Sequence, residues 1–125
     1  MPVDYIPGVC NIGPVEIRLR WTTGWVGFFF TTLIWLGFII NSSPAAWRLA
    51  LVVPAYVSAI GFLQASMHFC VAFGAKGLFN VKDQVGKVET VDQQEFRAKD
   101  QAKAIKMMLG ALAIATVVAL VAFAL

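Results

Sequence analysis

The chain is organised around residues 61–74, which read GFLQASMHFCVAFG. This stretch holds the only histidine of the sequence, His68, and one of its two cysteines, Cys70. It also holds Gln64, a glutamine surrounded by apolar residues. The stretch closes the longest apolar segment, so the most chemically versatile side chains lie where that segment ends.

Hydropathy extends this picture to the whole chain and predicts an integral membrane protein. The sequence has 125 residues, 59% of them hydrophobic, and a mean hydropathy of +0.75. A transmembrane helix needs about 20 mostly apolar residues. Three windows meet this need, at 21–40, 45–75 and 105–125. We expect one all-α membrane domain over 1–125, with no room for a soluble catalytic domain. The dispersed net charge of +3 argues against a nucleic-acid partner.

The first twenty residues are expected to lie at the membrane surface on the cytoplasmic side. Pro14 suits the first turn of a short helix before the first span. The first apolar run starts at Trp21 and exceeds a signal-peptide core of about 7–15 residues, so no cleavable signal is expected. Within the span, small residues at four-residue spacing predict a helix-packing stripe, formed by Thr23, Gly27 and Thr31.

The second span is predicted to form an antiparallel hairpin with the first. A polar turn ending in Pro44 separates them, and Pro54 is expected to kink the second helix. On a single helix over 45–75, one small and polar face would carry Val57, Gly61, Gln64 and His68. We expect Gln64 and His68 to form polar contacts with a neighbouring helix, because polar groups inside a membrane need partners.

Residues 76–104 form the only long hydrophilic piece and are expected to be a cytoplasmic loop and helix. Thr90 and Gln93 resemble a capping box, which predicts one helix from about residue 91 through the third span. With the stripe on the first span and the small face at Gly61 on the second, a third small-residue stripe is predicted on this span, at Ala111, Ala115 and Ala119.

The basic residues predict the orientation of the chain. Only Arg48 borders the turn between the first two spans; the other nine are Arg18, Arg20, Lys76, Lys82, Lys87, Arg97, Lys99, Lys103 and Lys106. Short loops rich in Lys and Arg stay in the cytoplasm. The N-terminus and the 76–104 region are therefore expected in the cytoplasm, and the C-terminus in the periplasm or outside.

The two cysteines fall on the cytoplasmic side in this topology. A stable disulfide between Cys10 and Cys70 is not expected in a reducing compartment. The favoured interpretation is two small thiols in packing sites. Whether Cys10 and Cys70 are close enough to interact is left open.

Two motifs resemble a family of small bacterial inner-membrane domains of unknown function. The first is NIGPVEIR over residues 11–18; the second runs from the Gly61–Cys70 stretch to the segment from Gly74 to Asn80. Members of the family stand alone or follow a rhodanese domain. The resemblance covers about residues 10–80 and implies a bacterial inner-membrane helical hairpin with cytoplasmic ends.

Side-chain chemistry favours a protein that is not an enzyme. His68, Cys70 and Cys10 supply at most three metal ligands, and a structural zinc site uses four. No nucleophile elbow or phosphate loop is present, and no Asp or Glu lies in an expected span.

We expect an accessory, assembly or scaffold subunit of a larger bacterial inner-membrane complex. Its partners would be other membrane subunits and lipid, in a hetero- or homo-oligomer. Two alternatives stay open. One is a subunit that binds haem or a chlorophyll-type pigment through His68. The other is a thiol-handling membrane partner that uses Cys10 and Cys70.

Overall fold

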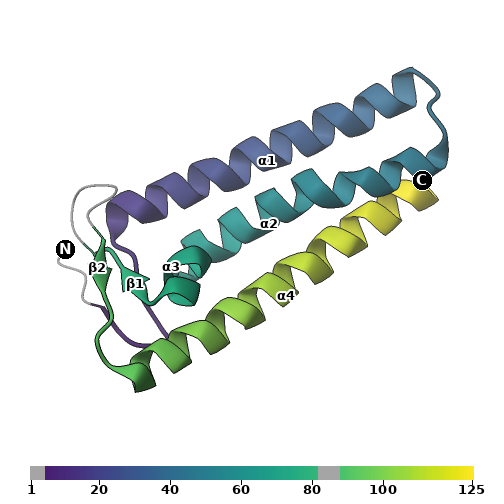
Figure 1. Cartoon of the computed structure of the whole chain (residues 1–125). Helices are drawn as coiled ribbons and strands as arrows, with labels where there is room; N and C mark the ends of the chain where they lie inside the picture. Colours follow the sequence, from purple (N-terminus) through teal and green to yellow (C-terminus); the bar gives the residue numbers. More distant parts are fainter. Residues whose placement is uncertain (1–4, 82–87) are drawn as a thin grey trace.

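The computed structural model describes residues 5–81 and 88–125, and helices dominate it (Figure 1). Three of its helical segments are long and apolar enough to cross a membrane, as the hydropathy predicts. Along the chain the elements are α1 (Pro14–Ile40), the 3-10 helix η1 (Ala45–Leu51), α2 (Val52–Met67), α3 (Val71–Lys76), β1 (Leu78–Phe79), β2 (Glu89–Thr90) and α4 (Gln94–Ala124).

The long helices lie side by side, with α2 between α1 and α4 (Figure 1). Residues 5–13, which we call the N-terminal segment, lie with α3 and both strands at one end of the bundle (Figure 1). The turn after α1 and the C-terminus lie at the other end (Figure 1). This arrangement separates a polar end, where several short elements meet, from an end that consists of helix termini and the turn between α1 and η1.

Helix α1 begins seven residues before the expected boundary at Trp21. Gly13 is its N-cap, Pro14 is its first residue and Glu16 places a negative charge in the first turn. The short surface helix and the first span are therefore one helix of 27 residues. At 1.5 Å per residue it measures about 40 Å, which exceeds the roughly 30 Å hydrocarbon core of a bilayer.

The expected single helix over 45–75 is wrong. The segment starts as η1, and Pro54 lies in the first turn of α2, where its missing N–H breaks no helical hydrogen bond. No kink inside a long helix is therefore needed. Helix α2 ends at Met67, because His68 adopts the left-handed conformation at φ +55°. The N–H of Phe69 reaches back to the carbonyl of Gln64 at 3.1 Å and closes the helix.

The all-α expectation also missed a small ribbon. Strands β1 and β2 pair antiparallel, with Leu78 opposite Thr90 and Phe79 opposite Glu89. Thr90 is thus part of a strand, and Gln93, the N-cap of α4, makes no side-chain capping bond. The predicted capping box is wrong and α4 starts at Gln94. It then continues without a break to Ala124, as the predicted extension of the third helix requires.

Helices α1 and α2 approach most closely at glycines. The hydroxyl of Ser58 donates to the carbonyl of Gly24 at 2.8 Å. A Cβ atom on Gly61 would lie 2.6 Å from the backbone nitrogen of Gly24, and one on Gly27 would lie 2.7 Å from that of Ser58. Of the expected stripe, Gly27 is in this contact, whereas the hydroxyls of Thr23 and Thr31 bond to carbonyls of their own helix.

The interior face of α4 is made largely of alanine. Ala111, Ala115 and Ala119 are almost fully buried where α4 packs against α2 and η1. A satellite core near the polar end comprises Phe69, Val71, Ala104 and Met107. Small side chains thus set the spacing along the helices, and larger ones fill the polar end.

The glycine contact yields a test of the packing of α1 against α2. In Gly61→Ala, the new methyl group meets backbone, which cannot rotate away, so the free energy of unfolding should fall by about 1–3 kcal/mol. Gly37→Ala is the matched control, since a Cβ there has no neighbour within 4 Å. Helicity followed during denaturation in mixed micelles measures both. Equal stability of the two variants would contradict the close approach.

Candidate functional site

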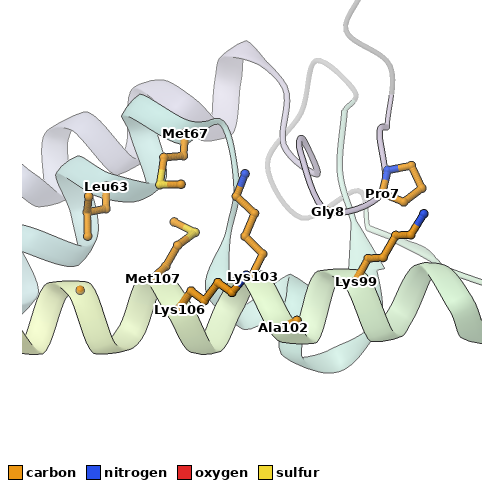
Figure 2. Close-up of a pocket in the computed structure, with 10 residues that line it drawn as sticks. Pro7, Gly8, Leu63, Met67, Lys99, Ala102, Lys103, Lys106 and Met107 are labelled. Carbon is orange, nitrogen blue, oxygen red and sulfur yellow. The ribbon is translucent and has the colours of Figure 1, made fainter.

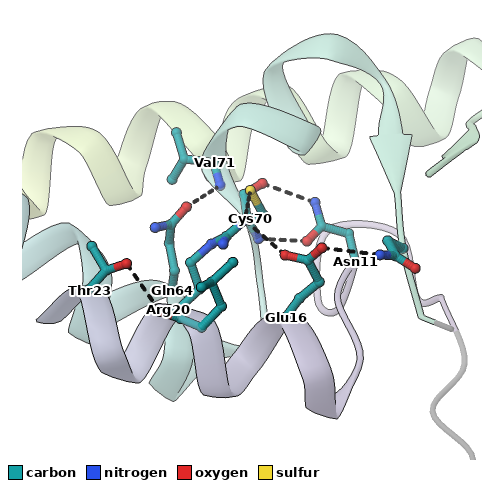
Figure 3. Close-up of polar contacts among 9 residues, drawn as sticks. Asn11, Glu16, Arg20, Thr23, Gln64, Cys70 and Val71 are labelled. Atoms are coloured by element: carbon teal, nitrogen blue, oxygen red, sulfur yellow. Dashed lines mark hydrogen bonds and ion pairs between the residues drawn. The ribbon is translucent and has the colours of Figure 1, made fainter. Parts of the chain in front are cut away.

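Six buried or mostly buried polar side chains meet at the end of the bundle where α1 begins and α2 ends (Figure 3). We call this cluster the polar junction; it consists of Asn11, Glu16, Arg20, Gln64, Cys70 and Asn80. Its members come from the N-terminal segment, α1, α2, the α2–α3 connection and the residue after β1. The junction therefore joins segments that are distant in the sequence.

Asn11 is the central member and is fully buried. Its side-chain oxygen accepts from the N–H of Cys70 at 2.6 Å, and its side-chain nitrogen donates to the carbonyl of Cys70 at 3.1 Å (Figure 3). Its backbone N–H donates to the carbonyl of His68, and its own carbonyl accepts from the N–H of Asn80. One residue thus satisfies the peptide groups exposed by the break after α2 and also connects to β1.

Glu16 is a carboxylate that is only 2% exposed. One oxygen accepts from the side chain of Asn80 at 3.1 Å, and the other lies 3.3 Å from the Arg20 guanidinium. The same nitrogen of Arg20 is 3.0 Å from the sulfur of Cys70 (Figure 3). A buried ion pair is strongly destabilised when one partner is removed, because the other charge stays buried and unpaired.

The prediction that Gln64 and His68 share one face of a single helix is wrong, because α2 ends at Met67 and His68 is not helical. The side-chain oxygen of Gln64 accepts from the N–H of Val71 at 2.9 Å and so caps the start of α3. His68 is exposed, and its imidazole has no hydrogen-bond partner among residues 5–81 and 88–125. The left-handed residue turns the chain away from the axis of α2. His68 thus lies exposed at the end of α2, and pigment binding through His68 with a partner chain stays a prediction.

The two cysteines lie at this same end, and both are free thiols. Cys70 is 2% exposed and Cys10 is 7% exposed. The Cys10 thiol donates to the carbonyl of Ile12 at 3.4 Å. Burial raises the pKa of Cys10, which lowers its thiolate fraction at neutral pH. In the described part of the chain, no three His, Cys, Asp or Glu side chains form a group that could hold a metal ion.

A second buried carboxylate, Asp100 of α4, lies near the junction. It is fully buried and accepts from the N–H of Gly8 at 2.7 Å and from the Tyr5 hydroxyl. Burial, reinforced by the hydrogen bond to Asp100, raises the pKa of Tyr5, so its hydroxyl stays a donor at physiological pH. Asp100 thereby fastens the N-terminal segment to α4.

Sequence reasoning missed most of these polar contacts. Asn11, Glu16 and Asn80 lie within the quoted motifs, but no pattern gave them a role. Asp100 offered a usable signal, because it shares one helical face with the buried residues Ala104, Met107 and Ala111. A charged residue on an otherwise apolar face predicts a buried partner.

The polar junction is arranged to hold segments together. Arginine cannot accept a proton, so Arg20 cannot act as a base toward Cys70. Glu16 is engaged by Asn80 and Arg20, and in the described part of the chain the exposed His68 makes no hydrogen bond to either thiol. The described residues therefore place no general base within hydrogen-bond reach of a thiol.

The Glu16–Arg20 pair can be tested against an exposed pair of the same spacing. Glu16→Gln leaves the guanidinium unpaired and should lower the free energy of unfolding by about 3 kcal/mol. Glu95→Gln is the control, since Glu95 and Lys99 form a solvent-exposed pair at 3.8 Å. This variant should lower the free energy of unfolding by less than about 1 kcal/mol. Adding Arg20→Met to Glu16→Gln should recover part of the loss in the same unfolding assay. Similar effects of the two single variants would refute the role of burial.

Comparisons with known proteins identify no relative of this chain. No family model, no curated protein and no solved structure matches the chain. The resemblance over residues 10–80 therefore stays a prediction.

Proposed function

We propose that the chain is a non-enzymatic accessory, assembly or scaffold subunit of a larger complex in the bacterial inner membrane. Its three long apolar helices cross the bilayer, and its polar end lies in the cytoplasm. The distribution of charge supports this orientation. Among the described residues, the polar end carries Arg18, Arg20, Lys76, Arg97, Lys99, Lys103 and Lys106, whereas Arg48 lies at the other end.

A groove across one face of the bundle is the observation that supports binding to a partner subunit. It measures about 480 Å³ and takes its lining from α1, η1, α2 and α4. Small residues form part of its lining, namely Ala55, Ser58 and Ala59. Apolar side chains flank it, including Phe28, Phe62, Ile114 and Val118. Small residues allow a further helix to approach closely, which is how transmembrane helices associate in lipid.

We assign the groove to a helix of a partner subunit. The small residues Ala55, Ser58 and Ala59 allow the backbone of such a helix to approach closely, and the apolar side chains that flank them pack against its sides.

Filling the groove should release the partner. Val118→Trp places a large side chain on its wall, and Leu109→Trp makes the same exchange at an exposed position of α4 outside it. In mild detergent extracts of native membranes, a partner chain should co-purify in a fixed ratio with the parent chain and Leu109→Trp. Its yield should fall at least about tenfold with Val118→Trp, a difference of about 1.4 kcal/mol.

A chain that purifies alone, or one whose partner is unaffected by Val118→Trp, would contradict the assignment of the groove.

One contact favours a second candidate, a thiol-handling role for Cys70. A cation beside the sulfur is a feature of reactive cysteines, and Arg20 lies 3.0 Å from Cys70. Burial opposes this role, because Cys70 is 2% exposed and access is needed for reaction. Cys10 is also buried, and its raised pKa disfavours the reactive thiolate.

Thiol labelling separates the two candidates. With N-ethylmaleimide at pH 7, each cysteine is followed alone in the Cys10→Ser or Cys70→Ser variant. We expect both thiols to react at least about tenfold more slowly in the folded protein than after unfolding in dodecyl sulfate. The rate at Cys10 should rise with pH, because its elevated pKa leaves mostly thiol at neutrality. Rapid labelling of Cys70 in the folded protein would favour the thiol-handling role.

A further inference from the structure

A second cavity lies at the polar end of the bundle, between α2, α4 and the N-terminal segment (Figure 2). It measures about 570 Å³. Pro7 and Gly8 border it on one side, and Leu63 and Met67 from the last turns of α2 border it on another. Figure 2 shows Met67 pointing toward Met107 across the space between α2 and α4. The polar junction contributes no residue to this lining.

The chemistry of the cavity changes along α4. Lys99, Lys103 and Lys106 follow one another at helical spacing and give the lining its positive charge. Met107 and Gly110 continue the same lining into the apolar part of the helix. From Lys99 to Gly110 the helix rises about 16 Å at 1.5 Å per residue. The cavity therefore combines a cationic part and an apolar part, and the cationic part is nearer the polar end.

The positive charge of this lining is only weakly compensated. Lys106 has no ion-pair partner in the described part of the chain. Lys103 donates to the carbonyl of Val9 at 3.2 Å and lies 5.3 Å from the centre of the Phe69 ring, contacts that position its ammonium group without neutralising it. Two carboxylates of α4 are already engaged elsewhere: Glu95 in its exposed pair with Lys99, and Asp100 with Tyr5 and Gly8.

We propose that this cavity binds one anionic phospholipid of the leaflet next to the polar end. The headgroup phosphate contacts Lys103 and Lys106, and the glycerol and upper acyl chain lie against Leu63, Met67 and Met107. A soluble anion would use the lysines but not the apolar part of the lining. Basic pockets between helices at a membrane boundary are suited to anionic headgroups, and each lysine contributes about 1 kcal/mol, or about fivefold in binding.

The test uses the purified full chain in a neutral detergent. Native mass spectrometry measures binding of phosphatidylglycerol and of phosphatidylcholine with identical acyl chains. Phosphatidylglycerol should bind at least about tenfold more tightly. Lys103→Gln with Lys106→Gln should weaken its binding about 25-fold, the product of two fivefold losses. Arg18→Gln with Lys76→Gln removes the same charge from exposed sites outside the cavity and should leave the binding within about twofold.

A charge-neutral variant tests the apolar part independently of the lysines. A Cβ atom at Gly110 would have only Leu63 within 4 Å, at 4.0 Å, so the side chain of Gly110→Leu starts in open space and extends into the cavity that Gly110 lines. It should weaken phosphatidylglycerol binding at least about fivefold, and it decides the matter if the double lysine variant fails to fold.

Several results would overturn the proposal. They are equal binding of the two lipids, equal losses in the cavity and control charge variants, or unchanged binding in Gly110→Leu. Displacement of the lipid by glycerol phosphate at similar concentration would assign the lysines to a soluble anion instead.

Discussion

The structure depends on the paired hydrogen bonds between the side chain of Asn11 and the peptide groups of Cys70. An apolar chain that leaves the helical conformation exposes peptide N–H and C=O groups, and these are costly to bury without partners. The Asn11 amide supplies one donor and one acceptor at the point where α2 has ended and α3 has not begun. Gln64 supplies another acceptor, for Val71. With these groups satisfied, the chain can turn sharply inside a buried region and bring α3 against α4.

The same end of the bundle gathers the buried charges. Glu16 is held between Asn80 and Arg20, and Asp100 is held by the N-terminal segment. These contacts join α1 to the residue after β1, and α4 to Tyr5 and Gly8. Asn11 in turn bonds to Asn80, so the polar end is one connected unit. The other end lacks such a network in the described residues, apart from Arg48, which donates to the carbonyl of Ala122. The long helices between the two ends depend on close glycine and alanine contacts.

Two features at different depths give the bundle its proposed binding surfaces. The groove beside Trp35 is apolar and contains small residues, which suits a partner helix. The cavity beside Lys103 is cationic on one side and apolar on the other, which suits an anionic lipid. They differ because α4 changes from charged to apolar near Met107. A subunit fixed by lipid at one level and by a protein helix at another has a defined depth and orientation.

The sequence by itself determined the number of long apolar helices, the hairpin and the concentration of basic residues at one end. Hydropathy and charge are local properties, so they can be recognised in single segments. Only the tertiary structure decided where the second helix breaks, because the residue that stabilises the break, Asn11, is 59 positions away from Cys70. The apolar run continues through His68 and Cys70 without a proline or glycine at the break, so helix was the natural expectation. The burial of Glu16 and Asp100 likewise depends on partners that are distant in sequence. Glu16 bonds to Asn80, and Asp100 bonds to Tyr5 and Gly8, so only the folded chain brings them together.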